Sequence, residues 1–147
     1  MSGLTPMGEG PRFEAARIED LAEVMGYVDA ACEGAGVPAE AAFAVRLAVE
    51  EAFTNIVKHA YADSPGPVRL ELSIDGTEVT VRLIDAAPLF DPAQAPPPDL
   101  DSDWDDRVEG GLGWHLVHQL MDEVRHEPAP GAGNIVTMIK RLPSAAS

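Results

Sequence analysis

Two polar side chains stand four residues apart within a largely apolar stretch of the sequence. They are Glu51 and Asn55. If this stretch is helical, the spacing places both side chains on one face. A carboxylate beside an amide oxygen suits a hard cation, and it also suits a hydroxyl group that must lose a proton. The ordinary alternative is a solvated helix face with an incidental Asn, although Asn is a poor residue for a helix interior.

Two further motifs could bind a phosphate and an amine. Gly111 and Gly113 stand just before an apolar helical pattern. Glycines at such a place let backbone N–H groups approach an anion, and the N-terminus of a helix favours negative charge. Asp85 follows an alternating stretch, and its carboxylate could accept a hydrogen bond from an exocyclic amine. The simpler interpretations are a flexible hinge for the glycines and an ordinary turn residue for the aspartate.

The periodicity of the sequence predicts the helices and strands that would position these residues. Apolar residues recur at helical spacing in three segments, and two hairpin patterns alternate with period two. Helices followed by strands, with one helix before the last hairpin, indicate an α+β class: a two-layer α/β sandwich with helices on one face of a mixed, mainly antiparallel sheet. The expected helices span 18–35, 39–62 and 112–124, and the expected strands span 68–74, 79–84, 124–127 and 135–140.

The length of 147 residues suits one domain with a core of its own. We expect a flexible lead-in over residues 1–10, a single domain over 11–142 and a short tail over 143–147. The stretch from about 86 to 110 is rich in Pro and Asp and has no sustained period. A loop of that length inside a compact domain is usually a functional lid or disordered.

The charge of the chain excludes several classes of function. The formal net charge is −15 at pH 7, so attraction to a nucleic-acid backbone or an anionic membrane surface is not expected. No apolar run approaches the roughly 20 residues of a spanning helix, and the N-terminus has no signal-peptide pattern. We therefore expect a cytoplasmic protein. The single cysteine, Cys32, excludes an internal disulfide.

The order of the motifs resembles a known family. A Glu-Ala-x-x-Asn helix, a strand ending in Asp, a variable lid and Gly-x-Gly opening a helix resemble the N, G1 and G2 boxes of the Bergerat ATP-binding fold. The anti-sigma/serine-kinase branch of the GHKL superfamily is the most similar. The stretches that carry this resemblance are 51–61, Phe90-Asp91-Pro92 and 111–124.

The resemblance implies a role for each candidate residue. Asn55 would bind Mg²⁺ bridging the ATP phosphates, Glu51 would be the general base, and Asp85 would accept from the adenine amine. The further nucleotide-binding residues would be Phe90, Gly111 and Gly113. The cofactors would be ATP and Mg²⁺, and the activity a protein-serine/threonine kinase. The partners would be a sigma factor and a STAS-type anti-sigma-factor antagonist, with a homodimer also plausible.

One departure from the family pattern keeps a second function open. The family usually has Gly two residues after the G1 aspartate, where this chain has Ala87. An added methyl there could crowd the adenine or require a backbone conformation that Ala adopts poorly. The alternative is a non-catalytic module that binds partners on a degenerate ATP-binding scaffold. A detached histidine-kinase ATPase domain is not expected, because no phosphoacceptor helix is predicted before the domain and the lid is of the short, Pro-rich kind.

Overall fold

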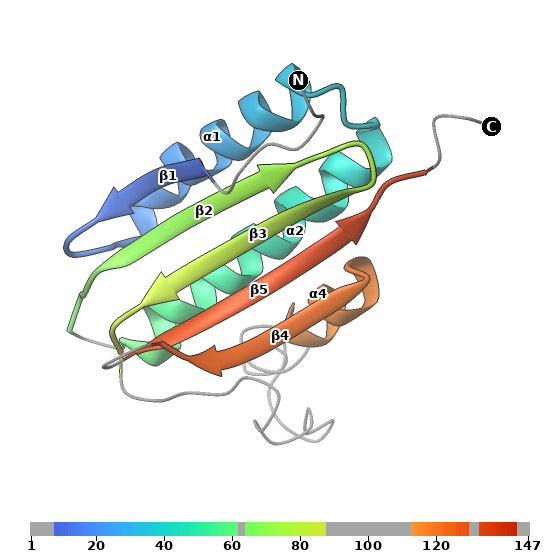
Figure 1. The fold of residues 1–147 in the computed structure, drawn as a ribbon. Coiled ribbons are helices and arrows are strands. Elements are labelled where there is room, and N and C mark those ends of the chain that lie inside the picture. Colours follow the sequence, from blue (N-terminus) through green and yellow to red (C-terminus); the bar gives the residue numbers. More distant parts are fainter. Residues whose placement is uncertain (1–7, 62–63, 88–112, 130–132, 144–147) are drawn as a thin grey trace.

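The strands of the protein form one open antiparallel sheet (Figure 1). The computed structural model describes residues 8–61, 64–87, 113–129 and 133–143. Within these ranges the sheet has five strands in the order β1-β2-β3-β5-β4, and each neighbouring pair is antiparallel. The strands are β1 (Gly8–Phe13), β2 (Val68–Ile74), β3 (Glu78–Asp85), β4 (Glu123–Pro128) and β5 (Asn134–Arg141).

The α-helices of the described residues cover one face of this sheet (Figure 1). A 3-10 turn, Ile18–Asp20, leads into α1 (Leu21–Gly34), and α2 (Ala39–Asn55) starts directly after Pro38. A π-helical segment, Ile56–Ala60, continues α2, and α4 (Gly113–Leu120) precedes β4. The two-layer α+β class expected from the sequence is confirmed.

The hydrophobic core lies between the helices and the sheet. Every second residue of β2 and β3 is buried against the helical layer, as period-two side-chain alternation requires. Phe53 of α2 is fully buried and meets the ring of Phe13 edge-on, with 6.2 Å between the ring centroids. Asp85 continues the buried series Val79, Val81 and Leu83 of β3. Its side chain therefore enters the helical layer at the end of the strand.

The strand β1 was not predicted. Gly8 and Glu9, which the sequence analysis placed in a flexible lead-in, pair with β2. The segment has no alternating pattern, and its pairing register shifts between Glu9 and Arg12, around Gly10 and Pro11. Edge strands tolerate Pro because one side needs no ladder partner. Gly10 is required sterically, since a Cβ there would lie 2.8 Å from the ring of Tyr27.

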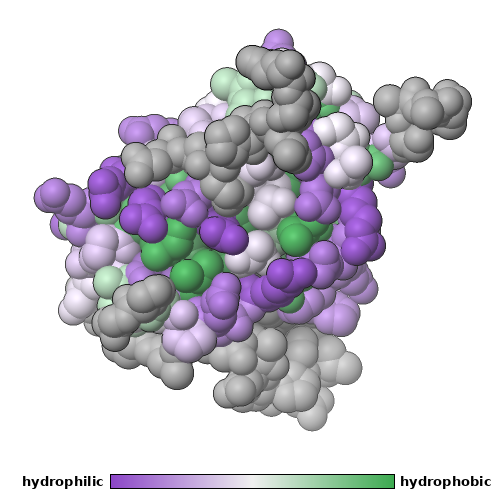
Figure 2. All heavy atoms as spheres, viewed as in Figure 1, coloured by the Kyte–Doolittle hydropathy of each residue, from purple (hydrophilic) through white to green (hydrophobic). Residues whose placement is uncertain are grey.

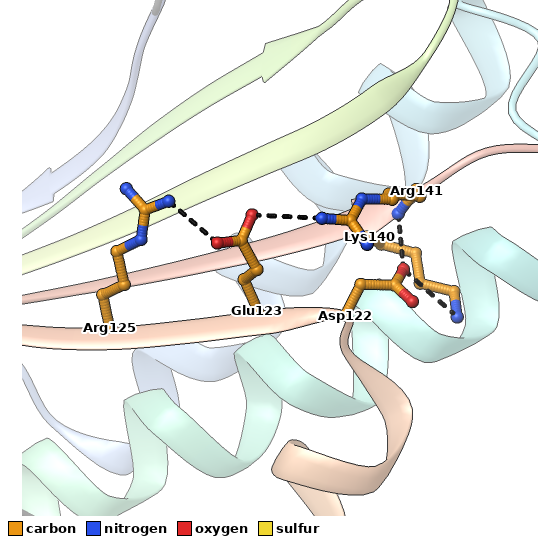
Figure 3. Close-up of polar contacts among 5 residues, drawn as sticks. All are labelled: Asp122, Glu123, Arg125, Lys140 and Arg141. Carbon is orange, nitrogen blue, oxygen red and sulfur yellow. Dashed lines mark hydrogen bonds and ion pairs between the residues drawn. The ribbon is translucent and has the colours of Figure 1, made fainter.

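The third helix is shorter than predicted and ends at Leu120, four residues before the expected end at Val124. Hydrogen bonds between β5 and residues 120–122 end the helix at this point. The Asp122 N–H donates to the Ile139 carbonyl, the Lys140 ammonium donates to the Leu120 carbonyl at 3.1 Å, and the Arg141 N–H donates to the Asp122 carboxylate at 2.6 Å. Ion pairs of Glu123 with Arg125 and Arg141 extend this network along β4 (Figure 3). Such charges also protect an edge strand from pairing with another chain.

No helix among the described residues is long and apolar enough to cross a membrane.

Candidate functional site

Glu51 and Asn55 lie one turn apart at the end of α2, as the sequence predicts. Asn55 is the last residue of this helix and is only 7% exposed, whereas Glu51 is partly exposed. Burial raises the pKa of Glu51, and the neighbouring Glu50 raises it further, while Lys58 has the opposite effect. A carboxylate with a raised pKa is a stronger proton acceptor than an ordinary glutamate.

Asp85 ends β3 and is 5% exposed. The Ala87 N–H and the side-chain amide of Asn134 both donate to its Oδ1 atom, each at 2.9 Å. Burial raises the pKa of Asp85, and these two donors partly offset that rise. The hydrogen bonds thus fix the orientation of the carboxylate in the helical layer.

Two residues that the sequence analysis did not select, Gly133 and Asn134, hold Asp85 in place. Asn134 is 1% exposed and pairs with Asp85 across β3 and β5. Gly133 has φ +105°, and a Cβ there would lie 1.9 Å from the Asp85 carbonyl oxygen. The Gly-Asn dipeptide is a signal for a turn, but no local pattern indicates its partner 49 residues earlier in the sequence.

Tyr61 connects the end of the helix to the end of the strand. Its hydroxyl accepts a hydrogen bond from the Ala86 N–H at 2.7 Å and donates one to the Pro67 carbonyl. Because Tyr61 follows the π-helical segment and Ala86 follows β3, these bonds join the segment that follows Asn55 to the turn that follows Asp85.

The remaining predicted residues belong to the lid and the G2 segment. Gly113 begins α4, and α4 packs against α2, the helix that carries Glu51. Phe90 and Gly111 lie outside the described residues. Ala87 is 2% exposed, and its methyl is therefore packed among protein atoms.

The donor set of this site fits Mg²⁺ bound together with phosphate. No cluster of three or more His, Cys, Asp or Glu side chains among the described residues could hold a metal ion unaided. Asn55 offers one buried amide oxygen. Mg²⁺ commonly takes one or two protein oxygens and completes its octahedron with phosphate and water oxygens. The residues present therefore fit a metal that arrives with a nucleotide.

The opposite face of the sheet also carries a groove, of about 660 Å³. Figure 2 shows this face, where hydrophobic surface is surrounded by hydrophilic side chains. Arg69, Ile84 and Ile135 line the groove, and they alternate along their strands with residues that face the helices. At the end of β3 the lining of the groove also includes Asp85 and Ala86, so the groove adjoins the candidate site there.

Comparisons with known proteins find relatives of the chain. A sequence profile of the histidine kinase-like ATPase domain matches residues 15–140. An anti-sigma F factor from Pasteuria penetrans is 36% identical over 103 residues, which cover 67% of each chain. A serine-protein kinase, RsbW, from Staphylococcus aureus is 36% identical over 92 residues, or 58% of each chain.

A solved structure shares the fold. It contains the RsbU and RsbW domains of Rv1364c from Mycobacterium tuberculosis and superposes with a TM-score of 0.61 at 20% identity, over 91% of this chain. The chain spans about a third (34%) of that larger protein.

Proposed function

The chain belongs to the histidine kinase-like ATPase family, in the group of GHKL anti-sigma factors and serine-protein kinases, and from this premise we propose that it is a Mg-ATP-dependent protein-serine/threonine kinase. The observation that carries the proposal is the placement of Glu51 and Asn55 on one face of α2, with the oriented carboxylate of Asp85 at the adjoining end of β3.

Each of these residues has a distinct task in the proposed reaction. The Asp85 carboxylate accepts a hydrogen bond from the adenine amine and so selects the base. Asn55 would contribute an amide oxygen to Mg²⁺, and the metal ion would supply neutralisation of charge on the phosphates. The N-terminus of α4, at Gly113, would offer backbone N–H groups to the phosphates. Glu51 accepts the proton of the attacking hydroxyl.

The proposed substrate is a serine or threonine of a STAS-type anti-sigma-factor antagonist. Phosphoryl transfer demands little covalent chemistry from a protein beyond positioning and charge neutralisation, so one carboxylate base suffices for a hydroxyl acceptor. The relatives named as an anti-sigma factor and as a serine-protein kinase support two linked activities. We propose that the protein sequesters a sigma factor in the cytoplasm when the antagonist does not occupy it, and that it acts as a homodimer.

A non-catalytic binding module is the second candidate, and Ala87 is the observation that favours it. The buried methyl stands where the family usually has no side chain. However, the Ala87 N–H donates to the Asp85 carboxylate at 2.9 Å, so this residue helps to orient the group proposed to recognise adenine. That hydrogen bond, together with the retained Glu51 and Asn55, favours the kinase.

The test is transfer of labelled γ-phosphate from Mg-ATP to a purified antagonist by the wild type, Glu51→Gln and Glu50→Gln. If Glu51 is the base, Glu51→Gln binds Mg-ATP normally but transfers phosphate at least about a hundredfold more slowly. Glu50→Gln removes a neighbouring charge on the same helix and keeps the activity. Wild-type rates in Glu51→Gln would remove this residue from the mechanism, and no transfer by the wild type would favour the binding module.

The pH profile of the same reaction separates a base from a structural carboxylate. Because burial raises the pKa of Glu51, the acidic limb of wild-type transfer should lie above the ordinary glutamate range. Glu50→Gln should move this limb to lower pH, since Glu50 is one cause of the raised pKa. An unshifted limb in Glu50→Gln would assign the titration to another group.

A further inference from the structure

Tyr61 sits between two strand ends and joins them through one hydroxyl. The Ala86 N–H donates to this oxygen at 2.7 Å, and the hydroxyl donates to the Pro67 carbonyl at 2.5 Å. One bond therefore reaches the turn after β3, and the other reaches the residue that precedes β2. A hydroxyl is needed for this arrangement, because the oxygen acts as an acceptor and a donor at once.

The position of that hydroxyl is set by packing on both sides of the residue. The Tyr61 N–H donates at 2.9 Å to the Ile56 carbonyl, five residues earlier, and so closes the π-helical turn that follows Asn55. The ring lies directly against Gly66, where an added Cβ would be 2.4 Å from the ring. Single π-helical turns are frequent at functional sites. Here the turn ends on the residue that contacts the Asp85–Ala87 segment.

We propose that Tyr61 is a positioning residue for adenine recognition, because its hydroxyl holds the Asp85–Ala87 turn at a fixed place relative to the end of α2. The inference rests on the proposed function and adds a residue to it. Asp85 would recognise the base, Asn55 would bind the metal at the phosphate end, and Tyr61 would set the separation between them. Tyr61 itself touches neither the base nor the phosphates.

A purely structural role would have a different signature. The loss of one hydrogen bond that merely stabilises the fold would weaken binding of all nucleotides alike, if it weakened binding at all. A displaced Asp85 would weaken binding only where the base offers an amine to the carboxylate. ATP carries that amine, whereas ITP has a carbonyl oxygen at the same ring position. The two nucleotides share the same ribose and phosphates.

The experiment measures dissociation constants of Mg-ATP and Mg-ITP for the wild type, Tyr61→Phe and Tyr27→Phe. Tyr61→Phe keeps the ring on Gly66 and removes only the hydroxyl. We expect it to weaken Mg-ATP binding by about fivefold, the effect of one hydrogen bond, and to leave Mg-ITP binding unchanged. Tyr27, in α1, is the matched control, since the chain has only these two tyrosines. Equal losses for both nucleotides in Tyr61→Phe, or none, would overturn the inference.

Amide hydrogen exchange tests the same contact without nucleotide. Tyr61→Phe should accelerate exchange at Ala86 and Ala87 and leave the Met138 amide in the interior strand β5 at its wild-type rate. An unchanged exchange rate of the Ala86 amide in Tyr61→Phe would show that the Tyr61 hydroxyl does not hold the turn. If the wild type bound neither nucleotide, the proposed function would fail, and the adenine role of Tyr61 with it. Normal wild-type binding with no change in Tyr61→Phe would overturn the Tyr61 inference alone.

Discussion

At the residue scale, the surroundings of Asp85 separate its effect on binding from its effect on stability. Both donors that hold the carboxylate, the Ala87 N–H and the Asn134 amide, act on the same oxygen. An amide oxygen could replace that atom without loss of either bond. The other position of the side chain would then carry an NH₂ group in place of a second acceptor oxygen.

Asp85→Asn should therefore abolish nucleotide recognition and spare the fold. The new NH₂ group would face the adenine amine, and two donors cannot form a hydrogen bond, so Mg-ATP affinity should fall at least about tenfold. The thermal midpoint at neutral pH should equal or exceed that of the wild type, since a buried charge has been removed. Titration calorimetry and thermal unfolding measure the two quantities, and wild-type affinity in Asp85→Asn would exclude the assigned role.

The difference in stability between Asp85→Asn and the wild type should depend on pH in a definite direction. Burial raises the pKa of Asp85, so the folded state binds this proton more readily than the unfolded state. Below the pKa that Asp85 has in the unfolded state, its burial does not lower the stability of the wild type. The wild type then loses stability as the pH rises through the pKa that Asp85 has in the folded state. Asp85→Asn has no group that titrates there. Its advantage in unfolding free energy should grow through the acidic range and then level off, and an advantage that shrinks would contradict the raised pKa.

At the element scale, the sequence predicts the elements with a strong local period and misses those fixed by distant contacts. The amphipathic helices and the Val68–Ile74 hairpin strand have patterns that a short window contains. The strand β1 has none, because pairing with β2 alone makes it extended. The end of α4 at Leu120 depends on hydrogen bonds from β5, about 20 residues later in the chain.

The residues of the candidate site also fall into those that a local pattern predicts and those that distant contacts place. Glu51, Asn55 and Asp85 are found from spacing and from the end of a strand. The contacts of Asn134 and Tyr61 with the Asp85 turn are evident only in the folded chain, since each residue lies 25 residues or more from its partner in sequence. A residue that holds another residue in place carries no chemical motif of its own.

The turn into β5 supplies the prediction at this scale. Gly133→Ala should be strongly destabilising, by about 3 kcal/mol or more, because it combines a positive φ with a methyl placed on the backbone of Asp85. Gly76→Ala is the control, since Gly76 has open space around its Cβ position. Chemical denaturation measures both free energies of unfolding. Equal, small losses in the two variants would show that the turn adapts and that Gly133 is not required.

At the scale of the whole molecule, the net charge of −15 sets the conditions for binding a nucleotide. ATP is itself strongly anionic, and the field of so acidic a protein repels it. The described residues offer Asn55 as a metal-binding oxygen but no cluster that retains a metal ion alone. Binding of ATP and binding of Mg²⁺ should therefore depend on each other through one residue.

The most direct test of the account is calorimetric titration of the wild type and Asn55→Ala with ATP, with and without Mg²⁺. We expect the wild type to bind ATP tightly only when Mg²⁺ is present, and Asn55→Ala to lose that dependence and bind weakly in both conditions. Wild-type binding that ignores Mg²⁺, or Asn55→Ala with an unchanged Mg-ATP dissociation constant, would contradict the metal-bridged nucleotide site on which the proposed kinase depends.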